Sequence, residues 1–565
     1  MRSLYYRLAD IQKTLKFKRA LLQTHSSFPL RSGDIEFYVD GAEAMQSVAE
    51  AISTARRKIH IMDWRMDLDI TLVRTPHPLQ SKKLVDLLAA AAIRGVQVSV
   101  ILYNSPWFSH LTDNRKTAKI LNKLHPNITC ICKHWSLIYS NHEKLVIVDN
   151  KVALLGGVDL CLGRYDNIFH HITPMVRDAP NGALLFPPAD YNNIQIPKTN
   201  RFQYPRMPWH DVHCKVDGEI IMDLQQHFLQ RWQFYGGEMQ TAPAQKKKGG
   251  VSMRFCQSSC KLSGGKNECS IYGEMLKLVR KAKRFIYIEQ QYFLSNSGKR
   301  NISNKIGREI AKKIIEAAKK DEKFFVIIVL PLFSEGELKH KSVRKMAEYT
   351  RLALYDGVGG IVSTLQKNGI DDWQKYLSVN NLYNVGWCEK LGVTLSQIYV
   401  HSKLMIIDDE FMLLGSANIN DRSLRGDRDT EIAISIEENE KVKLVFDKTE
   451  VLGGKEISDL RKRLWKEHLG ISDNLETLVE DPFTCYDELW KKIAQDNRDI
   501  LEQVFPLFPR NAFTKYIDTE LHTHPKAVEN RIPMLLKLQG HLVKNAQLFG
   551  SKEHQRSYGL TAIVT

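Results

Sequence analysis

The amino-acid sequence predicts an α/β protein with mixed sheets, made of two halves that repeat one plan and followed by a mostly helical region. Strand-like and helical segments alternate from Asp34 onward, and the alternation begins again after residue 270. A block of twenty residues also occurs near the end of each half. The expected segments are an N-terminal segment (1–33), a first half (34–240), a linker (241–270), a second half (271–455) and a helical C-terminal region (456–565).

The N-terminal segment has the pattern of a basic amphipathic helix. Its apolar residues recur at helical spacing and its basic residues accompany them: Leu4, Leu8, Ile11, Leu15 and Leu22, with Lys13, Lys16, Lys18 and Arg19. Such a helix lies either on an anionic membrane or against the body of the protein, and the second interpretation is favoured. No apolar stretch with a small-residue cleavage site follows, so a cleaved secretory signal is not expected.

The two halves are predicted from alternating apolar patterns. In the first half, strand-like segments at 36–40, 58–64 and 96–103 enclose helical ones at 41–57 and 82–95. In the second half, helical segments at 272–284 and 305–320 precede strand-like ones at 285–293 and 324–333.

The linker is rich in lysine, glycine and serine and has no apolar periodicity. It holds Cys256, Cys260 and Cys269, three of the nine cysteines of the chain. Because no fourth ligand has a suitable spacing, these cysteines are interpreted as loop thiols rather than as a zinc site. Nine cysteines are too sparse for a disulfide framework, so a reducing compartment is expected during folding.

An excess of positive charge is the one unusual feature of the composition. The 565 residues include 80 lysines and arginines against 64 aspartates and glutamates, a formal net charge of +16 at pH 7. Nucleic acid, an anionic lipid surface and a phosphorylated substrate fit this excess equally well, as does a surface that is basic only for solubility. The longest apolar stretch, ten residues at 324–333, is far shorter than the roughly 20 residues of a membrane span.

The duplicated block carries the candidate chemistry. The first copy, at 141–160, reads NHEKLVIVDNKVALLGGVDL, and the second, at 400–419, reads VHSKLMIIDDEFMLLGSANI. Six residues of the first copy correspond to six of the second at a constant distance of 259 positions: His142, Lys144, Asp149, Gly156, Gly157 and Asp159 with His401, Lys403, Asp408, Gly415, Ser416 and Asn418.

Each block is predicted to form a β-hairpin whose histidine and lysine share one face. Residues two apart on a strand point the same way, so His142 lies beside Lys144, and the same holds in the second copy. Asp149 and Asp408 have the opposite parity and are expected to hold the turn and its backbone amides. A lysine can neutralise phosphoryl oxygens while an imidazole acts as nucleophile or proton carrier, without any metal. A surface histidine beside a solvated lysine explains one such block but not two in register.

The motif HxKxxxxD followed by GG or GSxN, present twice, resembles the signature of the phospholipase D superfamily. The resemblance extends to RMPWHDV, YIEQQYF, GSANINDRSL, RDTEIAI and EDPFTCYDELWKKIAQDNRDILEQVF, and covers roughly residues 34 to 510. In these segments the chain is most similar to the eukaryotic-type phosphatidylcholine-cleaving phospholipases D. Their usual N-terminal lipid-binding domains are not expected here, because only some 33 residues precede the resemblance.

The resemblance implies a fold of two pseudo-twofold-related α/β/α sandwich halves and a role for each motif residue. His142 would form a phosphohistidine, while His401 would protonate the leaving alcohol and then activate water. Lysine and asparagine would bind phosphoryl oxygens, and two carboxylates would hold the second nitrogen of each histidine. The implied catalytic set is His142, Lys144, Asp149, His401, Lys403, Asp408 and Asn418, and the implied pocket and supporting set is Gly157, Asp159, Asp211, Ser416 and Glu431. No cofactor and no metal are implied.

An insert distinguishes the first half from the second. Asp211 lies 69 residues after His142, whereas Glu431 lies 30 residues after His401. The extra residues, roughly 167–204, are rich in proline, asparagine and aromatic side chains. They are interpreted as a loop over the mouth of the active site, with an ordinary surface excursion as the alternative.

The expected function is hydrolysis of a glycerophospholipid to phosphatidic acid and a free head-group alcohol, with transfer to other alcohols. Two alternatives keep the chemistry: a phosphodiesterase of nucleic acid and a cardiolipin-type phosphatidyl transferase. A basic membrane-binding scaffold with an incidental site is a third. The expected partner is a phospholipid membrane surface rather than nucleic acid, and the expected location is cytoplasmic or peripheral to a membrane. The reduced architecture also suggests a bacterial or protist protein, one that could be delivered into a host cell.

Overall fold

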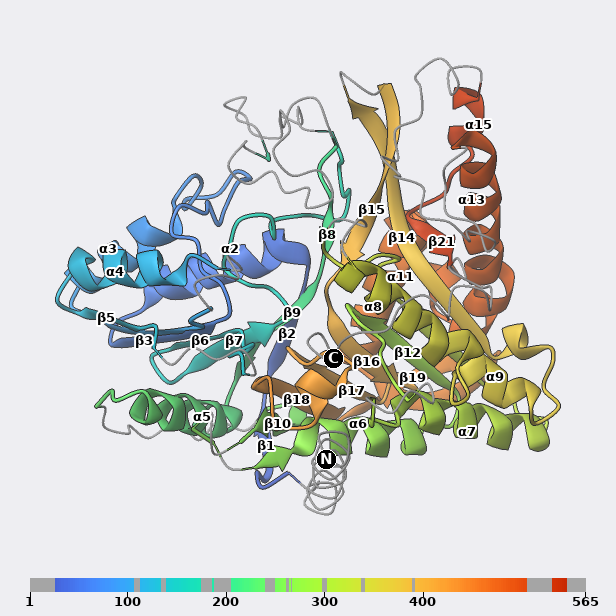
Figure 1. The fold of residues 1–565 in the computed structure, drawn as a ribbon, viewed down its shortest axis with the longest axis horizontal. Helices are drawn as coiled ribbons and strands as arrows, with labels where there is room; N and C mark the ends of the chain where they lie inside the picture. The colour runs from blue at the N-terminus through green and yellow to red at the C-terminus, as the bar shows by residue number, and fades with distance from the viewer. Residues whose placement is uncertain are drawn as a thin grey trace, which may run out of the picture.

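The computed structural model describes residues 26–105, 112–133, 139–173, 185–186, 205–238, 249–260, 264–265, 267–296, 302–336, 341–388, 392–505 and 531–545. The helix predicted near the N-terminus and most of the 167–204 insert lie outside these residues. The described chain forms two layered α/β units, with further helices beside the second one (Figure 1).

The first half contains a seven-stranded mixed sheet of the order β2-β9-β7-β6-β3-β4-β5 within the described ranges. Its strands are β2 (Ile35–Val39), β3 (Lys58–Asp63), β4 (Gln97–Leu102), β5 (Ile128–Ile131), β6 (Leu145–Val148), β7 (Val152–Gly156) and β9 (Val212–Asp217). One face is covered by α2 (Asp40–Thr54), α3 (Leu84–Ile93) and α4 (Asn114–Leu124), and the other by α5 (Ile220–Phe234) (Figure 1). In α2 the apolar side chains of Ala44, Val48 and Ile52 recur every four residues and are buried, which places one stripe of the helix on the sheet.

The second half repeats this sheet inside a larger one. Strands β10, β18, β17, β16, β12, β13 and β14 take the places of β2, β9, β7, β6, β3, β4 and β5, with the same antiparallel and parallel pairings. Further strands extend the sheet to twelve among the described residues. Strand order and direction therefore repeat in the two halves, as the predicted duplication requires.

The elements of the second half have the following bounds. The strands are β10 (Val251–Ser259), β12 (Phe285–Gln290), β13 (Phe325–Val329), β14 (Leu377–Cys388), β16 (Lys403–Ile407), β17 (Phe411–Gly415) and β18 (Glu431–Glu438), extended by β1 (Leu30–Gly33), β8 (Trp209–His210), β11 (Glu268–Cys269), β15 (Gly392–Val400) and β21 (Leu542–Lys544), with a separate hairpin of β19 (Lys441–Phe446) and β20 (Thr449–Gly454). The helical segments are α6 (Ser270–Lys281), α7 (Ile306–Lys319), α8 (Lys341–Arg351), η3 (Leu352–Asp356), α9 (Ile361–Gln366), η4 (Trp373–Lys375) and α10 (Asp421–Leu424).

The segment predicted as a linker contains β10, so this part of the chain differs from the expectation. Strand β10 pairs with β1 on one side and with β18 on the other. Val251, Met253 and Phe255 alternate into the central core with Ser252 and Arg254 between them, a strand pattern that the linker interpretation did not recognise. The cysteines of the segment are buried, and Cys256 and Cys269 lie on β10 and β11 rather than in the loop that was expected.

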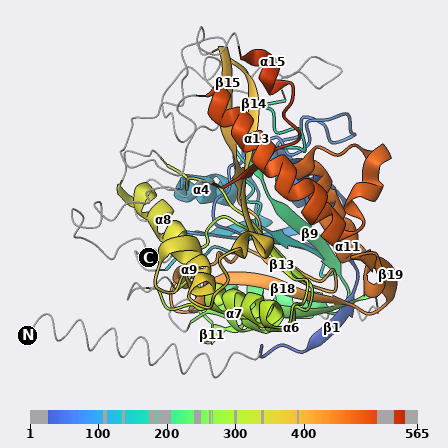
Figure 2. The same ribbon diagram turned by 90° about the vertical axis from the view of Figure 1, so that its right-hand side faces the viewer.

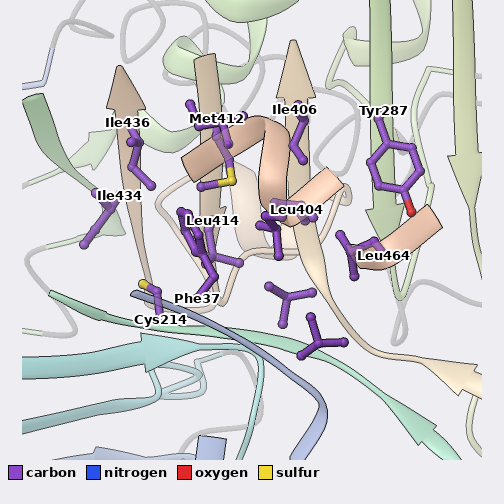
Figure 3. Packing of buried hydrophobic residues seen from close by; sticks show 14 of the residues in the cluster. Phe37, Cys214, Tyr287, Leu404, Ile406, Met412, Leu414, Ile434, Ile436 and Leu464 are labelled. Carbon is purple, nitrogen blue, oxygen red and sulfur yellow. The ribbon is translucent and has the colours of Figure 1, made fainter. Parts of the chain in front are cut away.

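The core of the molecule lies between the two sheets. Phe37 and Cys214 of the first half pack in one cluster with Leu404 and Met412 of the second, and Leu464 of the C-terminal region joins them (Figure 3). Each fully buried aliphatic side chain contributes about 1.5–3 kcal/mol relative to exposure. The halves are therefore joined by a continuous apolar core that holds their facing edges in one arrangement.

In its described part, residues 456–505 and 531–545, the C-terminal region is mostly helical and also contributes β21 to the large sheet. Its helical elements are α11 (Lys455–Leu469), η5 (Asp473–Val479), α12 (Pro482–Cys485), η6 (Tyr486–Trp490), α13 (Lys491–Val504) and α15 (Ile532–Leu535). Figure 2 shows α11 and α13 along one side of the second half. Trp465 and Trp490 are fully buried in the central core, with ring centroids 5.1 Å apart, so this region is part of the folded body.

Candidate active site

The two duplicated blocks form the predicted hairpins, β6 with β7 and β16 with β17. Asp149 and Asn150 have φ angles of 54° and 56°, and Asp408 and Asp409 have φ angles of 55° and 50°. Positive φ at two successive residues is typical of the tight turns that match the twist of a hairpin, and aspartate and asparagine tolerate it best.

The carboxylates of Asp149 and Asp408 accept hydrogen bonds from backbone amides. Asp149 accepts hydrogen bonds of 2.7–2.9 Å from the amides of residues 56–58, where β3 begins. Asp408 accepts three equivalent bonds of 2.7–2.9 Å from the amides of residues 283–285, where β12 begins. Their predicted role at the turn is therefore confirmed. These contacts hold both carboxylates against a neighbouring strand, which favours the role at the turn over the catalytic role that the resemblance implies.

Each motif histidine is held by a carboxylate from the other half. Oδ2 of Asp211 lies 2.7 Å from Nδ1 of His401, and Oε2 of Glu431 lies 3.0 Å from Nδ1 of His142. Backbone hydrogen bonds make the same exchange between the halves. The amide of His401 donates to the carbonyl of His210 at 2.8 Å, and the amide of His142 donates to the carbonyl of Thr430 at 3.0 Å. The structure thus brings together the histidines and carboxylates that the sequence singled out.

These contacts define which nitrogen of each imidazole can react. A buried carboxylate accepts the Nδ1–H, which leaves Nε2 of the neutral ring with a lone pair directed away from the carboxylate. Glu431 is further bound by the hydroxyls of Ser416 and Ser423, each at 2.6 Å. The side chain of His142 is 15% exposed, whereas that of His401 is 4% exposed, so His142 is the more accessible of the two.

The two lysines have different electrostatic partners. Nζ of Lys144 lies 2.8 Å from a carboxylate oxygen of Asp159. Burial opposes the charge of Lys144, but Asp159 and Asp63 outweigh it and raise its pKa. Nζ of Lys403 donates to Oε1 of Gln291 at 3.1 Å and to the carbonyl of His401. Burial lowers the pKa of Lys403 to about 7, because the attraction of Asp211 only partly offsets the loss of solvent.

Burial also shapes the acid–base behaviour of the histidine and carboxylate pairs. It lowers the pKa of His401, and the positive charges of Lys403 and Arg164 lower it further. It raises the pKa of Asp211 to about 7 and raises that of Glu431 above its ordinary value. A neutral His401 in the free protein follows, and a bound phosphodiester anion would favour its protonation.

Small residues after each hairpin make room for the supporting carboxylates. A Cβ atom on Gly157 would lie 1.9 Å from Oδ1 of Asp211, so a side chain is excluded there. Ser416 occupies the equivalent position in the second half and bonds to Glu431 instead. Asn418 corresponds to Asp159, and its buried Oδ1 makes no hydrogen bond within the described part of the chain. Because Oδ1 only accepts, a phosphoryl oxygen would have to be bound by the amide NH₂ of Asn418.

Three residues near the site were not identified from the motif. Arg164 stacks on Trp209, with its guanidinium carbon 3.7 Å from the ring centroid, and its Nε lies 3.8 Å from Asp159. The ring of Trp64 lies 6.1 Å from that of His142. Gln291, the partner of Lys403, directly follows β12 as Trp64 directly follows β3. All three occur in segments similar to the family, but their proximity depends on strand ends that meet only in the folded sheet.

The arrangement presents two imidazoles, two lysines and a buried arginine in one polar site. Two imidazoles that each keep a free Nε2 can act as nucleophile and as general acid on a phosphodiester, and the cations can stabilise charge on its oxygens. Among the described residues, the side chains close enough to share a metal ion gather around His210 and do not include His142 or His401.

Comparisons with known proteins agree with this geometry. A family model described as Phospholipase D matches residues 51–263, 251–392 and 391–531. Phospholipase D2 of Bos taurus is 32% identical in an alignment of 553 residues that covers 87% of this chain and 59% of that protein. Phospholipase D A of Dictyostelium discoideum is 33% identical over 462 residues, covering 79% of this chain and 36% of that protein. The chain thus spans less than two thirds of the length of either relative.

Among solved structures, phosphatidylserine synthase of Haemophilus influenzae Rd KW20 has a TM-score of 0.45 and 14% sequence identity, covering 75% of this chain and 87% of that chain.

Proposed function

Because the chain belongs to the phospholipase D family, we propose that it hydrolyses the phosphodiester bond between phosphate and head group in glycerophospholipids such as phosphatidylcholine. The products are phosphatidic acid and the free head-group alcohol. The observation that carries the proposal is the exchange of carboxylates between the halves, because it gives two imidazoles the same tautomer in one site. One imidazole can then attack phosphorus while the other handles the proton of the departing alcohol.

In the first step, Nε2 of His142 forms a bond to phosphorus and the bond from phosphorus to the head-group oxygen breaks. The leaving oxygen takes a proton from Nε2 of His401, so the head group departs as a neutral alcohol. Glu431 stabilises the positive charge that develops on the His142 ring through its contact with Nδ1. The greater exposure of His142 supports its assignment as the nucleophile.

In the second step, water attacks the phosphohistidine. His401, now neutral, accepts a proton from the water while the oxygen–phosphorus bond forms and the nitrogen–phosphorus bond breaks. Phosphatidic acid leaves and His401 is protonated again for the next turnover. A primary alcohol can replace water in this step, which gives a phosphatidyl alcohol. Lys144, Lys403 and Asn418 bind the non-bridging oxygens and stabilise their charge throughout.

The proposed substrate lies in a bilayer, and surface features support peripheral binding to one. None of the described helices combines the length and apolar character needed to cross a membrane. Phe169 is 58% exposed and Trp387 is 55% exposed. The segments that carry them are tied together, since Thr173 donates a hydrogen bond to the carbonyl of Trp387 and Asn384 donates one to that of Phe169. Exposed aromatic residues with a net charge of +16 suit an anionic lipid surface.

The test is an assay of purified protein on phosphatidylcholine vesicles in the presence of 1-butanol. Phosphatidylbutanol should form together with phosphatidic acid and choline, because both acceptors react with the same phosphohistidine. Phosphatidic acid without phosphatidylbutanol would contradict the covalent step. Cleavage of DNA or RNA without turnover of lipid would instead assign the site to nucleic acid.

A further inference from the structure

A second group of ionisable side chains lies buried behind the active site. It consists of Asp40 at the start of α2, His170 in the loop after β7, His210 on β8 and Glu467 on α11. The side chains of the first three are 0% exposed and that of Glu467 is 3% exposed. The group joins the first half to the C-terminal helix, and one of its members directly precedes Asp211.

The ligand-type atoms of these side chains surround a common point. Nδ1 of His210 lies 3.0 Å from Oδ1 of Asp40 and 3.1 Å from Oε1 of Glu467. Nε2 of His170 forms a hydrogen bond of 3.1 Å with the same oxygen of Glu467, a contact that a shared ion would replace, and lies 3.6 Å from Oδ2 of Asp40. Ligands of a tetrahedral zinc ion, bound at about 2.0–2.2 Å, are about 3.3 Å apart, so the observed separations bracket that value.

Carboxylates outside the group lie beside both imidazoles, and the one beside His210 is hydrogen-bonded to it. Nε2 of His210 lies 3.0 Å from Oε2 of Glu289. The same oxygen accepts a hydrogen bond from Ser402, and Oε1 of Glu289 interacts with Tyr287 and His468. Nδ1 of His170 lies 3.3 Å from a carboxylate oxygen of Asp166. A carboxylate behind the imidazole is typical of metal-bound histidines, because it directs the opposite nitrogen at the ion.

Four buried polar atoms of the group are without a hydrogen bond among the described residues: Oδ2 of Asp40, Nδ1 of His170, Nδ1 of His210 and Oε2 of Glu467. The first three belong to fully buried residues. Nδ1 of His210 lies 3.0 Å from Oδ1 of Asp40 and 3.1 Å from Oε1 of Glu467 without a hydrogen bond to either. Unsatisfied buried polar atoms are rare and costly, and a bound cation at the common point would satisfy Oδ2 of Asp40 and Nδ1 of His210.

We propose that Asp40, His170, His210 and Glu467 bind one zinc ion. Two imidazoles and two carboxylates form a four-ligand set that zinc accepts, and the two carboxylates neutralise its charge in the buried site. With four protein ligands and no exposure, the ion is structural and takes no part in the phosphodiester chemistry. It links α11 to β8 and so fixes the backbone that carries Asp211 beside His401.

The alternative to a bound zinc ion is protonation of the two imidazoles. Burial lowers the pKa of His170, but Asp40 and Asp166 outweigh it and raise that pKa to about 10 when no metal is bound. Two protonated imidazoles could therefore balance the carboxylates. A direct measurement of the metal distinguishes the two alternatives, because only zinc gives a stoichiometric signal.

The first experiment measures zinc by inductively coupled plasma mass spectrometry in full-length protein, purified without a histidine tag or chelator. We expect one zinc per chain, and X-ray absorption should show four nitrogen or oxygen neighbours at about 2.0–2.1 Å. Removal of zinc with dipicolinate should lower the thermal midpoint, and added zinc should restore it. Protein without zinc that also fails to take up added zinc would overturn the proposal. Sulfur neighbours would overturn it as well.

Substitutions then test the ligand set. His170→Ala and Glu467→Gln should each lose the zinc that the unaltered chain retains after dialysis. His541→Ala is the matched control. The ring of His541 lies 5.3 Å from that of His170, but His541 is not one of the four proposed ligands. Retained zinc in both ligand variants would overturn the assignment. If a ligand variant does not fold, the absorption spectrum of the unaltered protein decides. None of these measurements depends on lipid turnover.

Discussion

The carboxylate of Asp211 lies 2.7 Å from Nδ1 of His401, although 190 positions and the boundary between the two halves separate them. Glu431 and His142 form the reciprocal contact across 289 positions. Neither half therefore contains a complete pair of histidine and carboxylate. The site exists only when the halves pack together, which explains why a large apolar core joins them.

Replacing the supporting carboxylates should impair catalysis more than binding. Asp211→Asn keeps the size of the side chain but removes the acceptor that directs the Nδ1–H of His401, and Glu431→Gln does the same for His142. We expect kcat on phosphatidylcholine to fall about 10²–10⁴-fold in each, with little change in KM. Steady-state kinetics measures both constants.

Glu437→Gln is the matched control for Glu431→Gln, because both residues lie on β18 but Glu437 pairs with Phe411 at the far end of the hairpin. Its kcat should stay within about twofold of the unaltered chain, since surface changes are usually mild. A Glu431→Gln enzyme as active as this control would disprove the orienting role.

The turn aspartates should affect stability rather than chemistry. Asp149→Ala removes an acceptor of three backbone amides, and Asp408→Ala does the same in the second half. Each change should lower the free energy of unfolding by about 1–3 kcal/mol. Urea denaturation measures this loss. The activity of the folded fraction should be largely retained, and a full loss of kcat at unchanged stability would return the aspartates to the catalytic set.

The charge of Lys403 should give the reaction an alkaline limit. Its pKa is lowered to about 7, so the ammonium is present below that pH and is lost as the pH rises through it. We expect kcat/KM to decline above about pH 7, because a neutral amine no longer stabilises the phosphoryl oxygens. The decline of kcat should begin at a higher pH than that of kcat/KM, because the bound anion favours the charged form of Lys403.

Profiles of kcat/KM and kcat between pH 5.5 and 9 test this expectation. Lys403→Met should remove the alkaline limit and lower kcat/KM about 10²–10³-fold at low pH. A profile of Lys403→Met that keeps the same limit would show that another group titrates there.

Gly157 should tolerate no side chain. In Gly157→Ala the new Cβ would lie 1.9 Å from Oδ1 of Asp211, so the carboxylate must move away from His401. We expect a loss of kcat about as large as in Asp211→Asn, accompanied by lower thermal stability. Gly250→Ala is the control, because a Cβ at Gly250 meets nothing within 4 Å. Normal kcat in Gly157→Ala would mean that the position of Asp211 does not matter.

Local patterns in the sequence were sufficient to predict much of the site. The constant distance of 259 positions identified both histidine and lysine pairs, and strand parity predicted that Asp149 holds its turn. Such features depend on residues a few positions apart. The partners of β10 could not be predicted in this way, because its pairing with β1 and β18 joins segments that are far apart in the sequence. Arg164 and Gln291 were missed for a similar reason, since strands distant in sequence bring them to the site.

The sequence by itself determined the two α/β halves, the hairpins and the chemical groups that each hairpin carries. The tertiary structure decided which carboxylate serves which histidine, since Asp211 and Glu431 could each have turned to the histidine of their own half. It also gathered Asp40, His170, His210 and Glu467 from four separate elements into one buried group. Periodicity is a property of neighbouring residues, whereas these contacts arise from the packing of one sheet against another across a shared apolar core.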